Sequence, residues 1–276
     1  MKRLRWMMYG TVLTIACMVA CGVAFMYSGV YNVAASSEHT SAVYWALEQG
    51  MRASVRRHAS KVQVPALDEA TLAKGAHCFD ELCVQCHGGP GKGSSDIGKG
   101  MLPIAKSLVQ TARDWPPEYI YWVTRNGIRM AGMPAWEFRL ADHDLWAITS
   151  FIDRELPGLD ARQYQQRIAS AGGEQCERPS TRAAPDARRG LMTIRQYGCH
   201  ACHIIPGVTG PAVHVGPSLV GFSRRPLIAG AIPNTPENLV RWLRDPQKMR
   251  PQTLMPGLGV TEQHARDMQA YLATLD

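Results

Sequence analysis

Two cysteines three positions apart, followed directly by a histidine, occur twice in this chain, at residues 83–87 (CVQCH) and 199–203 (CHACH). In this pattern each thiol can add to a vinyl group of a haem, and the imidazole can take one axial face of the iron. The sequence therefore predicts two c-type haems, with His87 and His203 as the first axial ligands. The predicted covalent attachment points are Cys83, Cys86, Cys199 and Cys202.

Two other chemistries use the same cysteine pair. A lone Cys-x-x-Cys is typical of a redox dithiol or of half a zinc site, but here a histidine follows both pairs. A zinc ribbon would need its two pairs much closer together than residues 83–86 and 199–202 are. A thioredoxin-like dithiol would lie between a strand and a helix and would not repeat. Haem attachment explains both the histidines and the repeat.

A Met-Pro pair follows each motif, within an irregular segment, at Met133-Pro134 and Met255-Pro256. An iron with histidine on one face commonly takes a thioether sulfur on the other, which raises the reduction potential because soft sulfur favours ferrous iron. Proline fixes the neighbouring backbone, so Met133 and Met255 are the predicted sulfur ligands, with Met130 as the alternative in the first half. Both irons would then lack an open position for a substrate. The chain is predicted to carry electrons and to have no catalytic residue of its own.

A ligating imidazole needs a partner for its second ring nitrogen. Pro217, within residues 216–219 (GPSL), is predicted to accept that hydrogen bond from His203 and so to fix its tautomer. The first half has no such segment, and Pro103 is the nearest guess for the partner of His87. Surface or structural roles are predicted for His77, His143, His200, His214 and His264.

The two halves follow one plan, which predicts an all-α fold with two tandem haem domains. Each has an incoming helix, the cysteine motif, an irregular loop, a tryptophan-bearing helix, the Met-Pro pair and a closing helix. Trp122 and Trp242 are predicted to pack in the cores. Gly75 lies inside the first incoming helix, where glycine costs about 1 kcal/mol relative to alanine. It therefore predicts a close crossing with the closing helix, near residue 146.

The N-terminal region differs from the rest. Residues 6–33 carry no charge and are long enough to span the hydrocarbon of a bilayer as one helix. The basic residues before them predict a cytoplasmic N-terminus, with everything that follows on the periplasmic side of a bacterial inner membrane. The alternative is a lipoprotein signal cleaved before Cys21, although the apolar run continues well beyond that residue. Residues 41–59 predict an amphipathic helix, which either lies on the membrane or an integral-membrane partner, or packs on the first haem domain.

The net charge of +7 is concentrated in this arm. Residues 1–61 hold seven basic and two acidic side chains, and the other 215 residues carry only +2, which excludes a nucleic-acid-binding surface. The predicted division is an anchor with its juxtamembrane helix (1–61), a first haem domain (62–160), a linker (161–188) and a second haem domain (189–276). Cys78 and Cys176 either form a disulfide across the first domain or are unpaired structural residues.

Both halves resemble the class I cytochrome c fold. Residues 83–91 (CVQCHGGPG) and 132–136 (GMPAW) are similar to the cytochrome c domains grouped with the third subunit of bacterial haem-copper oxidases of the cbb3 type. The chain has no copper-A cysteine pair, and residues 104–108 (IAKSL) stand where such domains often have a Pro-Pro-Asp-Leu-like segment. The second half resembles the cytochrome c domain fused to subunit II of caa3-type oxidases, through residues 216–219, 233–239, 244–246 and 255–256.

The resemblance implies a function in a respiratory chain. A membrane-anchored dihaem cytochrome c in the periplasm would take single electrons from a redox donor and pass them to a haem-copper terminal oxidase. One alternative is the electron-accepting cytochrome subunit of a membrane dehydrogenase. A second is a dihaem peroxidase, which would need one iron without its methionine.

Overall fold

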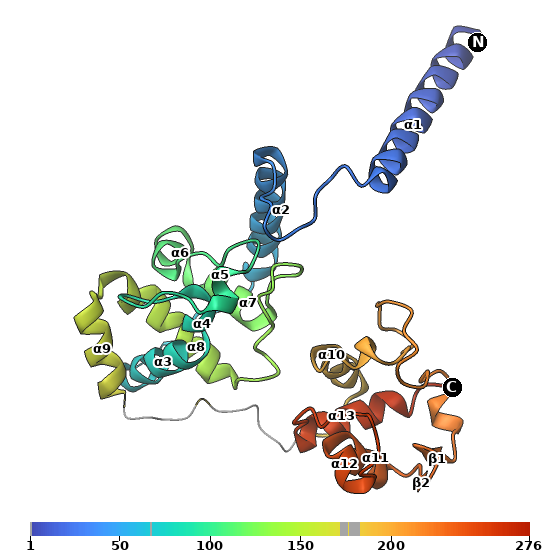
Figure 1. Ribbon diagram of the computed structural model, residues 1–276. Helices are drawn as coiled ribbons and strands as arrows, with labels where there is room; N and C mark the ends of the chain where they lie inside the picture. The colour runs from blue at the N-terminus through green and yellow to red at the C-terminus, as the bar shows by residue number, and fades with distance from the viewer. Residues whose placement is uncertain (1, 67, 172–175, 177–182) are drawn as a thin grey trace.

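A computed structural model describes the chain apart from residues 1, 67, 172–175 and 177–182. Figure 1 shows a long helix, α1 (Lys2–Ser28), standing apart from two helical units that follow one another along the chain. Within the described residues the strands are β1 (Leu227–Ile228) and β2 (Ile232–Pro233), which pair antiparallel with Leu227 opposite Pro233. The prediction of a mainly helical chain is confirmed.

The helices of each unit follow the predicted order. The first unit contains α2 (Ser41–Ala59), α3 (Glu69–Leu82), α4 (Val84–His87), α5 (Asp96–Lys99), α6 (Leu108–Asp114), α7 (Pro117–Asn126), α8 (Asp142–Ser150), a π-helical turn (Phe151–Glu155), a 3-10 turn (Leu156–Gly158) and α9 (Ala161–Ser170). The second unit contains α10 (Ala187–Gln196), 3-10 turns at Cys199–Ala201 and Phe222–Arg224, α11 (Pro236–Arg244), α12 (Pro246–Met249) and α13 (Glu262–Leu272).

Short polar side chains set where the helices begin. Asp68 accepts from the backbone N–H of Thr71 at the start of α3, and Thr235 accepts from that of Asn238 at the start of α11. Such caps satisfy one of the N–H groups that a helix leaves unpaired at its first turn. Pro117 opens α7, where its missing N–H costs nothing.

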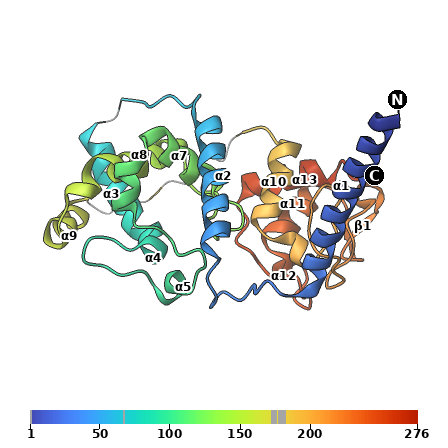
Figure 2. The ribbon, with the colours of Figure 1, turned by 90° about the horizontal axis from the view of Figure 1, so that it is seen from above.

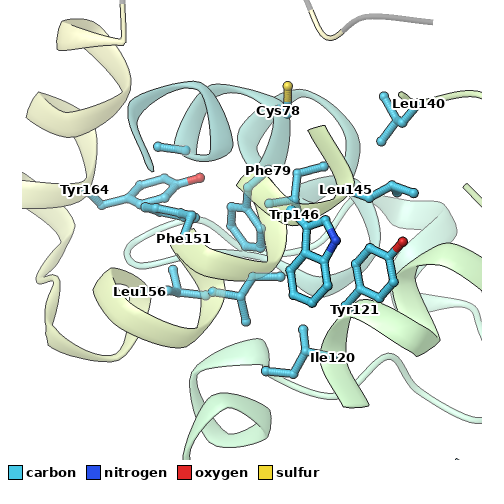
Figure 3. Packing of buried hydrophobic residues seen from close by; sticks show 13 residues of the cluster. Cys78, Phe79, Ile120, Tyr121, Leu140, Leu145, Trp146, Phe151, Leu156 and Tyr164 are labelled. Carbon is cyan, nitrogen blue, oxygen red and sulfur yellow. The ribbon is translucent and has the colours of Figure 1, made fainter. Parts of the chain in front are cut away.

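The core of the first unit is built on stacked and edge-on aromatic rings, shown in Figure 3. Tyr121 of α7 stacks on Trp146 of α8, with ring centroids 4.0 Å apart. Phe79 of α3 contacts Phe151, and the edge of Tyr164 closes the other side. The second unit has its own core, whose buried residues include Ile194, Phe222, Leu239, Trp242, Met268 and Leu272.

In both units the incoming helix crosses the closing helix at a glycine. A Cβ built on Gly75 of α3 would lie 2.1 Å from the carbonyl oxygen of Ala147 in α8, next to Trp146 as the sequence predicted. A Cβ built on Gly190 of α10 would lie 2.0 Å from the carbonyl oxygen of Asp267 in α13. No side chain fits at either position, because the obstructing atoms belong to backbone.

An ion pair with a buried aspartate lies beside each crossing. Lys74, directly before Gly75, places its Nζ 2.8 Å from Oδ1 of Asp144, whose side chain is fully buried. Arg189, directly before Gly190, contacts both carboxylate oxygens of Asp267 at 3.1 and 2.9 Å. Because each aspartate belongs to the closing helix, the charge pair fixes the register in which the two helices meet.

The first unit extends beyond residue 160, where the sequence analysis placed its end. Residues 161–170 form α9, and Tyr164 lies completely buried in the core with its hydroxyl donating to Asp80 at 2.7 Å. Asp160 and Gln163 form a capping box that starts this helix. The helix was missed because Tyr164 and Ile168 are the main apolar signals in an otherwise polar stretch. Beyond α9, Cys176 forms a disulfide with Cys78, so the paired alternative holds.

α1 is long and apolar enough to cross a membrane. None of its residues is buried against the rest of the chain, and its most apolar stretch has a mean hydropathy of 1.9. A helix of this length and composition at the N-terminus suggests single-pass membrane anchoring.

α2 packs on the first unit with its C-terminal half. Val55 and Ala59 are buried against Val123 of α7, and Figure 2 shows the two helices side by side. The imidazole of His58 stacks on Trp122, with ring centroids 5.6 Å apart. The connector alternative therefore holds for this half of the helix.

The loop after Met133 touches the second unit. Arg139 donates a hydrogen bond of 3.0 Å to the side chain of Gln196, at the end of α10. Phe138 lies edge-on to the ring of His264 in α13, with centroids 6.5 Å apart. The two clusters of buried apolar residues share no member, so each unit keeps a separate core.

Candidate haem sites

α3 delivers the first cysteine motif as a continuous turn. Cys83 ends that helix, and its carbonyl accepts from the backbone N–H groups of Cys86 and His87 at 3.1 and 3.0 Å. The second motif repeats this arrangement, because the carbonyl of Cys199 accepts from the N–H of His203 at 3.0 Å. One turn of backbone thus places two thiols and an imidazole next to one another at the end of an incoming helix.

The thiols of both motifs are free, and the first thiol of each motif lies in surroundings that disfavour the thiolate. Burial raises the pKa of Cys83 to about 12 and that of Cys199 to about 11. A redox dithiol needs the opposite shift, since the thiolate is its nucleophile. Among the described residues, no group of three or more His, Cys, Asp or Glu is placed to hold a metal ion, so the four motif cysteines do not assemble a zinc site.

Each motif histidine is oriented by a backbone carbonyl. Nδ1 of His203 lies 2.7 Å from the carbonyl oxygen of Pro217, the partner that the sequence predicted. Nδ1 of His87 lies 2.8 Å from the carbonyl oxygen of Lys106, so the guess of Pro103 is wrong. A carbonyl only accepts, so Nδ1 carries the proton and Nε2 keeps its lone pair for a metal. Burial also lowers the pKa of His87, although the hydrogen bond to Lys106 acts in the opposite direction.

The residue that supplies the carbonyl beside His87 also forms an ion pair with α2. Lys106 lies in the irregular segment between α5 and α6, and its Nζ is 2.7 Å from Oε1 of Glu48 in α2. The same carboxylate accepts from Nε of Arg52 at 2.7 Å. Sequence reasoning missed both Lys106 and Glu48, because they are distant in sequence from His87 and belong to no motif.

We expect the attachment of α2 to weaken in acid. Burial alone would raise the pKa of Glu48, but hydrogen bonds and charges from Lys106 and Arg52 outweigh it and hold the pKa below the usual 4.5. A carboxylate with a depressed pKa stabilises the docked state fully above its ordinary pKa, and that stabilisation is lost as pH falls through the lower value. Amide exchange of α2, corrected for intrinsic rates and compared with α13, should therefore rise below pH 4.5. A Glu48→Gln variant should exchange faster already at neutral pH; unchanged exchange in it would contradict the role of this pair.

Each motif histidine borders a cleft that is partly lined by aliphatic side chains, and Lys92, Ser94 and Ser107 also line the cleft beside His87. His87 lines one together with Leu108, Val109 and Leu156. His203 lines the other together with Ile204, Ile205 and Val208. An imidazole with a free Nε2, two adjacent thiols and an aliphatic wall are what a flat apolar macrocycle with a central iron requires, so the residues fit a covalently bound haem at both places.

The second site shows two further details. A Cβ on Gly216 would lie 2.4 Å from the ring of His203, so the backbone packs flat against the imidazole and restricts its rotation. His200 lines the same cleft, and within the described residues its buried Nδ1 has no hydrogen-bond partner. His200 also packs against Gly210, which agrees with the structural role predicted among its alternatives.

The predicted sulfur ligands lie on loops packed against the cores. Met133 is partly buried beside Val55 and Val123, and its carbonyl accepts from the N–H of Ile128 at 3.2 Å. Met130, the alternative, is 95% exposed, which makes it the poorer choice. Met255 packs against the second core. The end of the Met101 side chain lies against Gly132, so this loop holds a further thioether that the sequence analysis did not weigh.

Comparison with known proteins bears on the first site directly. Residues 70–152 match the family model described as cytochrome C oxidase, cbb3-type, subunit III. This range includes the first cysteine motif and Met133. The chain contains a cytochrome c domain related to those of haem-copper oxidases. A cytochrome c domain implies a c-type haem, and the matched range contains the first Cys-x-x-Cys-His motif.

Curated proteins similar to parts of this chain are named as subunits of such oxidases. "Cytochrome c oxidase subunit 2" of Alkalihalophilus pseudofirmus is 31% identical over 126 residues, which is 46% of this chain and 34% of the relative. The protein of the same name from Bacillus sp. strain PS3 is 37% identical over 96 residues, 33% of this chain and 26% of the relative. "Cbb3-type cytochrome c oxidase subunit CcoP" of Cereibacter sphaeroides is 32% identical over 85 residues, 31% and 28% of the two chains. The chain thus spans about a third of the length of these relatives.

Proposed function

We propose that this chain is a membrane-anchored dihaem cytochrome c that carries single electrons to, or within, a haem-copper terminal oxidase complex. The observation that carries the proposal is the duplicated site. In each unit a helix leads into two free thiols and an imidazole whose Nδ1 is bound by a backbone carbonyl. The names of the relatives support the oxidase as the partner.

The second haem domain rests on the internal repeat. The family match covers residues 70–152, and residues 189–276 are assigned by their own features. Both units have a basic residue followed by a glycine on the incoming helix, and a buried aspartate on the closing helix that binds the basic residue. A shared crossing of this kind, leading in both cases into Cys-x-x-Cys-His, supports two tandem cytochrome c domains.

The haem, when bound, supplies a centre that gains and loses one electron. The chain's own residues fix its setting. In the proposal Cys83 and Cys86 hold the first ring and His87 with Met133 binds the iron, while Cys199, Cys202, His203 and Met255 do the same in the second unit. The carbonyls of Lys106 and Pro217 keep each imidazole in one orientation, so that little rearrangement accompanies a change of charge.

The proposed cellular location of the chain depends on α1. We propose that α1 crosses the bacterial inner membrane once and that both haem domains lie in the periplasm, where a redox donor can reach them. The basic residues Lys2, Arg3 and Arg5 in the first turn of α1 support this orientation. The disulfide between Cys78 and Cys176 supports an oxidising compartment.

Two measurements test the proposal. A pyridine haemochrome assay on the mature chain should return two haem equivalents, and a Cys199→Ser, Cys202→Ser double variant should return one. Purification from detergent-solubilised membranes should recover a haem-copper oxidase with the chain. Recovery of a dehydrogenase instead would favour an electron-accepting subunit, and fewer than two equivalents in the wild type would remove the dihaem assignment.

A further inference from the structure

The first two turns of α2 differ from the half of the helix that packs on the first unit. Tyr44, Trp45 and Leu47 have 46, 65 and 59% of their surface exposed. Residues 40–47 (TSAVYWAL) carry no charge. Large apolar side chains grouped in this way at a helix end, without a charged residue among them, mark a surface that meets a partner.

The end of α1 lies close to the start of α2. The connecting residues 29–40 would reach about 40 Å if fully extended. They are not extended, because Tyr31 contacts both α1 and the residue that precedes the cap of α2. Its hydroxyl is 2.5 Å from Nδ1 of His39, directly before the Thr40 cap of α2, and its ring lies 6.5 Å from that of Phe25 in α1. The exposed turns of α2 are therefore held near the end of the membrane-anchoring helix.

The chemistry of the exposed turns fits the boundary of a bilayer. Tryptophan and tyrosine favour the headgroup level of membranes, where the ring is apolar and the N–H or O–H reaches water. Leu47 can enter the acyl region beside them. From Glu48 onward the helix carries charge and binds the first unit through Lys106, which limits how deeply it can enter. Arg56 and Arg57, both exposed, follow two turns later and suit an anionic headgroup layer.

We infer that residues 40–47 of α2 insert into the interfacial layer of the same membrane that α1 crosses, so that α2 holds the first haem domain at the membrane surface. This inference rests on the proposed anchoring by α1 and does not depend on the identity of the redox partner. The occupant of the exposed turns is lipid, not a second protein.

Spin labels at two matched positions test it. Ala46 and Ala53 are both exposed alanines of α2, seven residues apart and so on one face, about 10 Å apart along the axis. Ala46→Cys and Ala53→Cys would be made in the full-length haem-loaded chain carrying Cys17→Ser and Cys21→Ser. The chains would be reconstituted in nanodiscs containing anionic lipid. Collision rates with oxygen, which partitions into lipid, and with a water-soluble nickel chelate would then be measured.

The label at Ala46 should favour oxygen by severalfold over the label at Ala53, which should favour the nickel chelate. Equal access of both labels to the chelate would overturn the inference. A third sample, labelled at native Cys17 in a Cys21→Ser chain, distinguishes a failure of the anchoring by α1 from a failure of the docking of α2. Lipid exposure at Cys17 with an aqueous Ala46 would refute the docking of α2 alone, whereas an aqueous Cys17 would refute the anchoring and the docking together.

Discussion

A Met255→Ala variant should keep both haems and lose sulfur ligation at one site only. The ring stays attached because the two thioether bonds and His203 are untouched. The reduction potential of that site should fall, since soft sulfur stabilises ferrous iron and axial ligands span about 0.8 V in haem proteins. The other site should keep its potential. Redox titration followed by visible absorption and electron paramagnetic resonance would resolve the two sites.

The first unit offers a matched comparison. Met133→Ala should produce the same loss at the other site, while Met130→Ala should leave both potentials in place, because the Met130 side chain is 95% exposed. Met101→Ala is the second control, since its side chain reaches the same loop. Two unchanged potentials in Met255→Ala would remove Met255 as a ligand, and a loss of sulfur in Met101→Ala would transfer the role from Met133 to Met101.

Alanine at either crossing glycine should unfold the unit that contains it at a lower temperature. The new methyl group would lie about 2 Å from a backbone oxygen, so α3 and α8, or α10 and α13, must separate. We expect Gly75→Ala and Gly190→Ala each to cost about 3 kcal/mol, the upper part of the range for overpacked cores. Thermal unfolding followed by circular dichroism would measure the loss.

Gly50→Ala is the control for Gly75→Ala and Gly190→Ala. Gly50 also lies inside a helix, α2, but nothing approaches within 4 Å of a Cβ built on it. Gly50→Ala should therefore be neutral or raise helix stability by up to about 1 kcal/mol. If Gly75→Ala and Gly190→Ala behaved like Gly50→Ala, the close crossings described here would be wrong.

The local features of this fold were predictable from sequence. The amphipathic helix at residues 41–59 matches α2 residue for residue, and proline or threonine marked the starts of α7, α11 and α13. Gly75 predicted a close crossing because glycine costs about 1 kcal/mol inside a helix and lets a neighbouring backbone approach closely. These signals lie within a few residues of the structure that they produce, which is why one sequence suffices to find them.

Features that depend on distant residues were not predictable. The carbonyl beside His87 belongs to Lys106, and nothing in residues 101–107 distinguishes it from Pro103 until the chain has folded. α9 depends on Tyr164 meeting Asp80, 84 positions earlier. The sequence did not decide whether α2 lies on the membrane or packs on the first haem domain. An apolar stripe on a helix can be buried by lipid or by protein.

The disulfide of the first unit has a consequence for haem attachment. Cys78 lies five residues before Cys83 and eight before Cys86, so a newly made chain presents three thiols within nine positions. Thioether formation consumes reduced thiols, and a bond from Cys78 to either neighbour would block it. Pairing with Cys176 removes Cys78 from that competition. With Cys78 paired to Cys176, Cys83 and Cys86 are the two cysteines of this segment whose thiols stay free.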